Sequence, residues 1–346
     1  MSDEIRVGLV GFGAAGRFFH APLIAVTPGL RLAAVVTRDP EKARLVRLAH
    51  PDAEVVGAAE ELWSRSDLIV IASPNRTHVP LAEAALRADL PVVVDKPLAG
   101  TAAESRALTA LAAERGLPLT VFQNRRWDGD FLTIRRLLPE LGEVRRLESR
   151  FERWRPVPKG GWREQGGPGE LGGLLYDLGS HLVDQALQLL GPVTAVYAES
   201  DVRRAGVAAE DDVFLALTHA NGARSHLWMS AVAGQLGPRF RVVGADRTYV
   251  TWGMDPQEDR LRAGTAPDEK GFGARPEAEW GTLGVLGEVA RVPTEPGAYL
   301  DFYRGVAAMV REKAAPPVDP GGVVAALAVL EAAKVAAAEE RVVELG

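Results

Sequence analysis

Residues 7–16 contain the stretch that decides the fold, Val7-Gly8-Leu9-Val10-Gly11-Phe12-Gly13-Ala14-Ala15-Gly16. The apolar run over residues 5–10 predicts a buried strand, and a helical pattern follows over residues 16–26. The glycines between them have the spacing G-x-G-x-x-G. In such a loop the first glycine permits a tight turn, the second lets the backbone approach a pyrophosphate, and the third lets helix and strand pack closely. The predicted dinucleotide loop therefore comprises Gly11, Phe12, Gly13, Ala14, Ala15 and Gly16, and an ordinary structural turn is the alternative.

The end of the second predicted strand, residues 32–36, indicates which dinucleotide would bind. NAD sites usually have Asp or Glu at this point to bind the ribose hydroxyls, whereas this chain has Thr37 followed by Arg38. Asp39 is better explained as the N-cap of a helix that begins at Pro40. Because a guanidinium suits a 2′-phosphate and a neutral threonine does not repel it, we expect NADP, with NAD possible. A solvated surface arginine is the alternative for Arg38.

The chain of 346 residues has room for about two domains. In its first third, short apolar runs alternate with helical patterns, which is typical of a doubly wound parallel sheet. The predicted strands are residues 5–10, 32–36, 68–72, 91–94 and 117–122, and the predicted helices are 16–26, 40–49, 79–88 and 101–115. We therefore predict an α/β Rossmann domain over residues 1–123.

After residue 123 the pattern changes to segments with alternating polarity, which predict mostly antiparallel strands. These segments lie near 144–154, 193–202, 212–220, 224–231, 239–245 and 248–253. Helices are expected near 129–139, 172–190, 298–314 and 321–341, and the Gly- and Pro-rich region 255–297 is expected to be a loop. We therefore predict an α+β domain with a large, mostly antiparallel sheet over residues 124–346.

Composition excludes several classes of function. The formal charge of −6 has no block of like charges, which argues against a nucleic-acid or anionic-membrane partner. The absence of cysteine excludes disulfides, thiolate metal sites and cysteine nucleophiles. The start of the chain is acidic, unlike that of a signal peptide. The longest apolar run, Val323 to Leu330, is shorter than a membrane-spanning helix, which needs about 20 residues. We expect a soluble cytoplasmic protein with a small-molecule partner.

Lys96 is the first candidate catalytic residue. The chain has only six lysines, and Lys96 alone directly follows a hydrophobic strand, residues 91–94, at its C-terminal end. Ligand crevices in open α/β sheets form at that edge, and partial desolvation there makes a lysine a useful proton donor or acceptor. A lysine that reaches solvent from a strand end is the alternative.

Asp177 and His181 form the second candidate pair. They are four residues apart within the predicted helix 172–190, so they would share one face. A carboxylate beside an imidazole fixes the ring and raises its basicity, which suits acid–base chemistry. The alternative is a structural pair, and His20, His50, His219 and His226 lack such a partner at helical spacing. No set of metal ligands is visible, so no metal site is predicted.

Aromatic residues and cations are mixed in three further stretches, which suits a hydroxyl-rich ligand. They are Asn124-Arg125-Arg126-Trp127-Asp128, Trp154, and Trp162-Arg163-Glu164. Interdomain salt bridges and core tryptophans are the alternative explanation.

Several of these motifs together resemble the glucose–fructose oxidoreductase / inositol dehydrogenase (Gfo/Idh/MocA) family. They are the glycine loop, Ser73-Pro74-Asn75-Arg76-Thr77-His78, Asp95-Lys96-Pro97, and Asp177 with His181. The likeness covers nearly the whole chain in order and spacing. Residues 124–133, 162–167 and 176–181 look closest to the bacterial branch that contains NADP-dependent scyllo-inositol dehydrogenase.

The resemblance implies roles for individual residues. Lys96, Asp177 and His181 would be catalytic, the Lys96–Pro97 peptide bond would be cis as in many relatives, and Asn75, His78 and Arg163 would lie against the cofactor. Asp95 departs from the pattern, since most relatives have Glu. With the motif arguments above, the cofactor set is the glycine loop, Thr37, Arg38, Ser73, Pro74, Asn75, His78, Asp95, Lys96, Pro97, Asn124 and Arg163. The substrate set is Lys96, Arg126, Trp127, Trp154, Asp177 and His181.

The expected activity is hydride transfer between NADP and a secondary alcohol of a polyol or sugar, or its ketone, with an inositol-like substrate favoured. The resemblance favours His181 as the base and Lys96 as the group that polarises the oxygen, while the residues themselves leave the two roles open. It also implies a homodimer or homotetramer formed through the sheet of the second domain. An NAD-dependent glycoside hydrolase and a non-catalytic NADPH sensor are the alternatives.

Overall fold

The computed structural model describes residues 4–166 and 171–346, with the backbone alone at residues 162 and 163. Internal contacts divide the chain into two units, neither of which is continuous in sequence. Unit 1 comprises residues 1–127, 256–272 and 298–324, and unit 2 comprises residues 128–255, 273–297 and 325–346. The unit that begins at the N-terminus is therefore completed by two segments from the last third of the chain.

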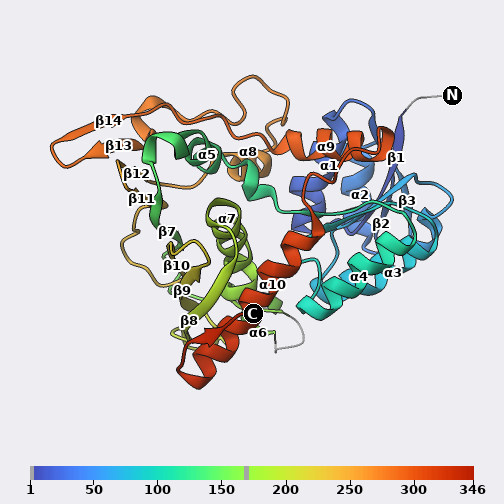
Figure 1. The fold of residues 1–346 in the computed structure, drawn as a ribbon. Coiled ribbons are helices and arrows are strands. Elements are labelled where there is room, and N and C mark those ends of the chain that lie inside the picture. The colour runs from blue at the N-terminus through green and yellow to red at the C-terminus, as the bar shows by residue number, and fades with distance from the viewer. Residues whose placement is uncertain (1–3, 167–170) are drawn as a thin grey trace. The chain divides into compact units, whose positions relative to one another are not determined.

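A six-stranded parallel sheet with the order β3-β2-β1-β4-β5-β6 forms the centre of unit 1 (Figure 1). Its strands are β1 (Ile5–Val10), β2 (Leu30–Val36), β3 (Glu54–Val56), β4 (Leu68–Ile71), β5 (Val92–Asp95) and β6 (Leu119–Phe122). β4 and β6 are buried at every position, as expected for strands covered on both faces. The order reverses beside β1, where doubly wound sheets bind their ligands. The predicted Rossmann architecture is confirmed.

Two helices of unit 1, α2 (Pro40–Ala49) and α4 (Ala102–Glu114), begin at the capping residues that the sequence contains, Asp39 and Thr101. The other helical segments of this unit are η1 (Gly16–His20), α1 (Ala21–Val26), η2 (Ala59–Leu62), η3 (Asn75–Thr77), α3 (His78–Arg87), η4 (Asn124–Trp127), α8 (Gln257–Ala263) and α9 (Tyr299–Arg311). Asp39 caps α2 by accepting from the N–H groups of Glu41 and Lys42, at 2.9 and 3.2 Å. Thr101 and Glu104 form a capping box at the start of α4. α9 packs against α1, so a late segment covers the Rossmann sheet.

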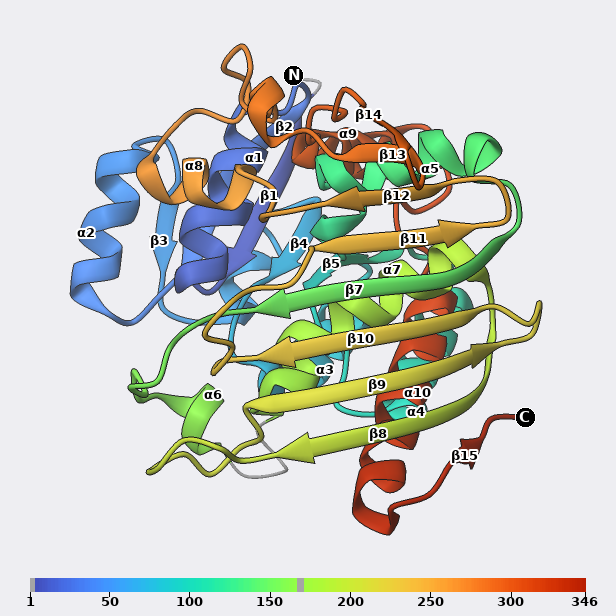
Figure 2. The same ribbon diagram turned by 90° about the vertical axis from the view of Figure 1, so that its left-hand side faces the viewer.

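Unit 2 is built on a nine-stranded sheet with the order β14-β13-β12-β11-β7-β10-β9-β8-β15. Its strands are β7 (Val144–Glu152), β8 (Val193–Asp201), β9 (Asp212–His219), β10 (Arg224–Ser230), β11 (Phe240–Gly244), β12 (Thr248–Thr251), β13 (Thr282–Val285), β14 (Glu288–Arg291) and β15 (Val343–Glu344). β7 and β10 pair in parallel and the other neighbours are antiparallel, which confirms the predicted mostly antiparallel sheet. Figure 2 shows one face of this sheet without covering helices.

Helices pack on the other face of the sheet. They include α5 (Gly129–Leu141) against β11 and β12, and η6 (Leu175–Gly179) with α7 (Ser180–Leu190) against β10. The short α6 (Trp162–Gln165) lies between α5 and η6 in the chain. Alternate residues of β9 are buried, as expected for a sheet that is covered on one face.

Two secondary-structure predictions were wrong. Residues 255–297, predicted to be a loop, contain α8, η7 (Glu277–Glu279) and the hairpin of β13 and β14. Their glycines and prolines act as turns between short elements, as at Gly287 with φ +87° in the hairpin. β3 was missed because three residues carry almost no periodic signal.

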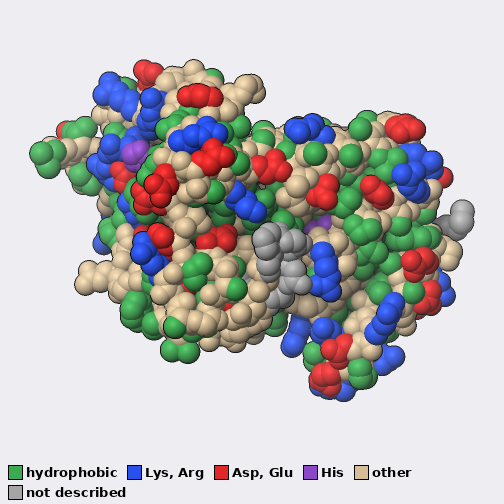
Figure 3. Space-filling model, turned by 90° about the horizontal axis from the view of Figure 1, so that it is seen from below, with side chains coloured by type: hydrophobic (Ala, Val, Ile, Leu, Met, Phe, Trp, Pro, Cys, Tyr) green, Lys and Arg blue, Asp and Glu red, His purple; other side chains and the backbone are tan. Residues whose placement is uncertain are grey.

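α10 (Pro320–Glu339) bears on the expectation that no segment spans a membrane. Among the residues that the structure describes, it is the one helix long and apolar enough to do so by length and composition. Core helices of soluble proteins pass the same test, and 44% of its most apolar window is buried. The sequence prediction considered only uninterrupted apolar runs, whereas this helix continues with apolar residues past Glu331 and Lys334. On the face drawn in Figure 3, acidic and basic side chains are interspersed.

Candidate active site

The glycine loop between β1 and η1 has the local geometry of a dinucleotide site. Gly11 has φ +98°, and a Cβ there would lie 2.8 Å from the carbonyl oxygen of Ala72. A Cβ on Gly16 would collide with the carbonyl oxygen of Gly11, whereas nothing lies within 4 Å of the Cβ position of Gly13. The first glycine therefore serves the turn, the third serves close packing, and the second leaves the backbone open to a ligand. These residues fit a bound pyrophosphate.

The end of β2 presents Thr37 and Arg38. The Arg38 side chain is exposed, and its Nε donates to the carbonyl oxygen of Gly57 at 3.1 Å. Within the described parts of the chain, no carboxylate pairs with this guanidinium. Thr37 accepts from the N–H of Asp39 at 3.3 Å, and Asp39 is used as the cap of α2, as predicted. The nearest carboxylate is thus already bonded to backbone N–H groups of the helix.

The loop after β4 contains Ser73, Pro74 and Asn75, none of them fully buried. His78, by contrast, is 0% exposed, with Nδ1 2.7 Å from the carbonyl oxygen of Pro97 and Nε2 2.9 Å from that of Ser73. The ring therefore ties the loop after β4 to the turn after β5. The expectation that His78 lies against the cofactor stays a prediction, and in this structure the ring is buried between the two loops.

Lys96 lies directly after β5, at the C-terminal edge of the parallel sheet, and it is half-buried. The Lys96–Pro97 peptide bond is cis, as the resemblance implied. Burial raises the pKa of the Asp95 carboxyl, but the contact with His20 at 3.6 Å and the charges of Lys96 and His78 outweigh it. The net pKa of Asp95 therefore lies below its usual value, and Lys96 follows an ionised carboxylate.

In unit 2, Asp177 and His181 lie on successive helical segments. Asp177 belongs to η6, a π-helical turn, and His181 to α7, where its side chain is 6% exposed. The prediction of one regular helix was therefore incomplete. A π turn widens the ring of backbone hydrogen bonds and is often found at functional sites, so the pair does not have ordinary i, i+4 geometry.

Glu210 meets the start of η6. Its carboxylate accepts from the N–H of Leu175 at 3.2 Å, and a Cβ on Gly173, at φ +86°, would collide with the same carboxylate. Burial raises the pKa of Glu210 by more than the hydrogen bond from Leu175 and the charge of Lys334 lower it. Lys334 also lies over the ring of Tyr176, 5.5 Å from its centre.

The mixed aromatic and cationic stretches have different surroundings. Arg125 is buried and pairs with Glu258 at 2.7 Å, and both residues belong to unit 1, so this pair is not the interdomain salt bridge given as the alternative. Asn124 is also buried, and Arg126 and Trp127 are half-buried, with Trp127 edge-on to Phe302. Trp154 is 60% exposed. The side chains of Trp162 and Arg163 lie outside the described residues, so the role predicted for Arg163 stays a prediction.

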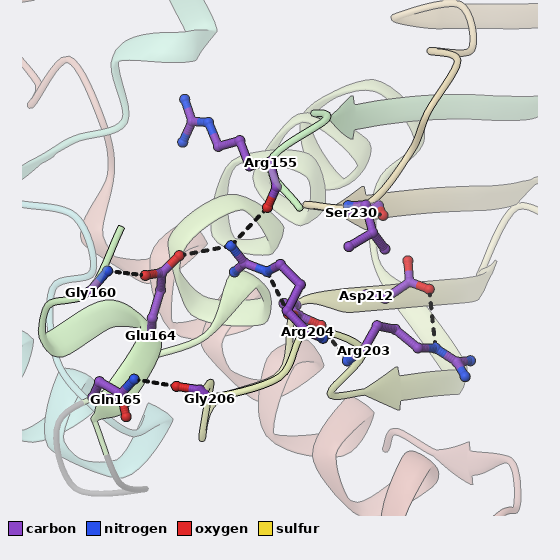
Figure 4. A network of polar contacts seen from close by, with 11 residues as sticks. Arg155, Gly160, Glu164, Gln165, Arg203, Arg204, Gly206, Asp212 and Ser230 are labelled. Carbon is purple, nitrogen blue, oxygen red and sulfur yellow. Dashed lines mark hydrogen bonds and ion pairs between the residues drawn. The ribbon is translucent and has the colours of Figure 1, made fainter. Parts of the chain in front are cut away.

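Arg204, which the sequence did not single out, anchors the segment that carries residues 162 and 163 (Figure 4). Its guanidinium donates to Glu164 of α6 at 2.9 Å and to Asp211 at 2.7 Å, and also to the carbonyl oxygen of Arg155 at 3.1 Å. Glu164 in turn accepts from the N–H of Gly160 at 2.7 Å. The Arg204 side chain is 5% exposed, so this network is largely removed from water.

His20 was also overlooked, because its partners are distant in sequence. Its Nδ1 lies 2.6 Å from the hydroxyl of Tyr303, and its Nε2 lies 3.6 Å from Oδ1 of Asp95. No group of three or more metal-ligating side chains was found among the described residues. The groups that each unit offers, a lysine in one and a carboxylate with an imidazole in the other, suit proton transfer.

Comparisons with known proteins agree with this geometry. A family model described as the NAD-binding Rossmann fold of an oxidoreductase family matches residues 5–123, and its C-terminal alpha/beta domain matches residues 136–345. An uncharacterized oxidoreductase of Escherichia coli, YdgJ, is 42% identical over 88% of each chain. The scyllo-inositol 2-dehydrogenase (NADP(+)) IolW of Bacillus subtilis is 34% identical over 99% of this chain and 96% of its own.

The solved structure of the oxidoreductase yvaA of Bacillus subtilis superposes with a TM-score of 0.94 at 34% identity, covering 100% of this chain and 99% of the other. An oxidoreductase of Yersinia pestis gives 0.91 at 38% identity, covering 100% and 98%. Both domains of the family thus occur here in order and over nearly the full length. The chain is a member of the Gfo/Idh/MocA family of oxidoreductases.

Proposed function

We propose that this oxidoreductase uses NADP to interconvert a secondary alcohol of a polyol or sugar and the corresponding ketone, and that an inositol is the favoured substrate. The observation that carries the proposal is the open glycine loop followed by an exposed Arg38 in place of the usual ribose-binding acid. The Bacillus subtilis relative, whose name gives both scyllo-inositol and NADP, supports the choice of cofactor and substrate class.

The specificity for NADP is assigned to Thr37 and Arg38. The bond from Nε to Gly57 holds the guanidinium at the end of β2, and guanidinium groups bind phosphate oxygens in two-pronged fashion. Asp39 is bonded to backbone N–H groups of α2 and does not replace the missing acid. A 2′-phosphate at this place would meet a fixed cation and a neutral hydroxyl, so NADP(H) should bind better than NAD(H).

Lys96, Asp177 and His181 are proposed to perform the proton chemistry. NADP, when bound, supplies or accepts the hydride. Lys96 and His181 hold the substrate oxygen; His181 takes or gives its proton while Lys96 polarises it, and Asp177 positions His181. Arg126, Trp127 and Trp154 are proposed to contact the remaining hydroxyls of the substrate. These roles rest on the motif order that the chain shares with its family.

The uncovered face of the unit 2 sheet is proposed to form a homodimer or homotetramer. Its aromatic side chains Phe214 and Trp228 have ring centres 5.1 Å apart, and Arg150 lies over Trp228 at 3.9 Å. A large exposed sheet face with aromatic residues and arginine has the composition of a protein interface. We further propose that the enzyme works in the cytoplasm on small molecules, with no nucleic-acid or membrane partner.

A spectrophotometric screen tests the proposed function. Inositols, aldoses and their keto forms are offered to the purified protein with NADP(H) and NAD(H) in parallel, and the change in reduced cofactor is followed. We expect turnover of at least one polyol or its ketone, faster with NADP(H). Cleavage of a chromogenic glycoside with tightly held NAD, or NADPH binding without turnover of any substrate, would contradict the proposal.

A further inference from the structure

Three polar side chains of unit 1 form a line that ends next to Lys96, and we propose that Tyr303 and His20 position Lys96 through Asp95. The hydroxyl of Tyr303 lies 2.6 Å from Nδ1 of His20, whose Nε2 faces Oδ1 of Asp95 at 3.6 Å. Asp95 directly precedes Lys96 in the chain. The inference rests on the proposed function, because it gives these residues a role only if Lys96 acts on the substrate.

The surroundings of the line are apolar and closely packed. His20 and Tyr303 are both 0% exposed, and the ring of Phe122 lies 4.5 Å from that of His20. Phe122 is also the partner of Asp95 in the pairing of β5 with β6. In such a place a polar group needs a partner, so the hydroxyl, the imidazole and the carboxylate constrain one another.

The direction of the hydrogen bond between Tyr303 and His20 follows from the protonation of the tyrosine hydroxyl. Burial, together with the negative charge of Asp95, raises the pKa of Tyr303 well above its usual value, so its hydroxyl keeps its proton and donates to Nδ1. The other ring nitrogen of His20, Nε2, faces the ionised Asp95 at 3.6 Å. The titratable groups that act on Asp95 are His20, Lys96, His78 and Tyr303.

In this arrangement the Asp95 carboxylate interacts electrostatically with the Lys96 ammonium. His20 and Tyr303 limit the movement of that carboxylate from the buried side, and in this way they influence the environment and orientation of Lys96. His20 ends η1, the helical segment that starts at the third glycine of the dinucleotide loop. The segment η1 therefore begins at the last glycine of the cofactor loop and ends at the residue that faces Asp95, next to Lys96.

Tyr303→Phe tests the proposal by removing one oxygen atom, and Tyr299→Phe, on the same helix and equally buried, is the control. We expect Tyr303→Phe to lower kcat about ten-fold or more and to shift the pH profile of kcat, with the Kd for NADPH within about two-fold of wild type. Asp95→Asn should behave in the same way, and Asp95→Glu should restore most of the activity because it keeps the carboxylate.

A second measurement does not depend on turnover. The six lysines can be labelled by reductive ¹³C-methylation, and Lys96→Arg assigns the Lys96 resonance. We expect Tyr303→Phe and His20→Phe to shift this resonance and leave those of the other five lysines unchanged, while Tyr299→Phe shifts none. If no substrate is found for the wild type, the proposed function fails, yet this experiment still decides whether Lys96 is positioned.

The result that would overturn the proposal is a folded Tyr303→Phe variant whose kcat, pH profile and Lys96 resonance all match those of Tyr299→Phe. If the larger change His20→Phe prevents folding, Tyr303→Phe alone decides. A drop in thermal stability that is equal in the two tyrosine variants, without a change in kcat or in the resonance, would assign a structural role only and would also overturn it.

Discussion

Nδ1 of His78 lies 2.7 Å from the carbonyl oxygen of Pro97, and this contact joins the loop after β4 to the turn that carries Lys96. The other ring nitrogen meets the carbonyl oxygen of Ser73 at 2.9 Å. A carbonyl only accepts, so the ring nitrogen that carries the proton donates to the carbonyl oxygen it faces. The predicted cofactor and catalytic segments of unit 1 are thus held together by one buried ring.

His78→Leu should therefore weaken unit 1 and loosen both segments. The loops would lose the donor that the ring supplies, at a cost of about 1–3 kcal/mol for a carbonyl left buried without one. We expect a lower unfolding temperature and weaker NADPH binding, measured by calorimetry and fluorescence titration. The unfolding temperature of His78→Asn, which keeps one donor group, should lie between those of wild type and His78→Leu. Wild-type stability of His78→Leu would show that the contacts contribute nothing.

Arg38→Ala should weaken NADPH binding about ten-fold or more, because a charge-assisted bond to the 2′-phosphate contributes about 1.5–3 kcal/mol. NADH binding should change by less than about three-fold. Arg44→Ala is the matched control, since Arg44 is an exposed arginine of α2 that pairs with Glu41 at 2.7 Å. Equal losses for the two cofactors in Arg38→Ala would remove its role in NADP selection.

Lys96→Ala should lower kcat by about 10²–10⁴-fold, the usual contribution of a positioned acid–base group. NADPH should still bind, because the glycine loop and Arg38 are unchanged. Lys270→Ala, at an exposed lysine of the same unit, should leave kcat as it is. Turnover of Lys96→Ala at the wild-type rate would place the chemistry elsewhere.

Glu210→Gln should change how the stability of unit 2 depends on pH. Burial raises the pKa of Glu210, so the folded protein holds this proton to higher pH than the unfolded chain does. Stability must then fall as pH rises from the ordinary pKa of a glutamate, about 4.3, through the raised value. Thermal unfolding followed upward from about pH 4, close to the ordinary pKa of a glutamate, should show this decline in wild type and a flatter profile in the variant. If the stability of wild type and of Glu210→Gln changed with pH by the same slope, the expectation would be contradicted.

Arg204→Met should release α6 and leave two carboxylates without their cation. Removing one partner of a buried ion pair costs about 3–5 kcal/mol, and Arg204 holds both Glu164 and Asp211. We expect a lower unfolding temperature and faster proteolysis within residues 156–166. Arg203→Met is the neighbouring control, since Arg203 is 56% exposed and pairs with Asp201 at the surface. Equal sensitivity of the two variants would show that the network does not anchor the segment.

The sequence was sufficient for the features that depend on local patterns. The glycine spacing predicted the tight turn in which Gly11 has φ +98°. Asp39 predicted the start of α2, and the change from helical to alternating polarity predicted the two kinds of sheet. Each of these depends on residues within one turn or one strand of one another.

The features that were missed depend on contacts between distant residues. His20 and Tyr303 are 283 positions apart, and no periodic pattern connects them. The burial of His78 follows from the positions of two loops, and Arg204 acquires its role from Glu164, 40 residues earlier. A pattern within one segment cannot show which partner the fold brings to it.

The order of segments in unit 1 has a consequence for how the protein is made. Residues 298–324 belong to this unit, where Tyr303 contacts His20 and the carbonyl oxygen of Val318 accepts from the hydroxyl of Thr120 at 2.9 Å. During translation the strands of the six-stranded sheet are therefore synthesised early and α9 nearly at the end. Unit 1 can complete its folding only after residues 298–324 have been synthesised. An isolated fragment of residues 1–123 would expose the surface that α9 covers.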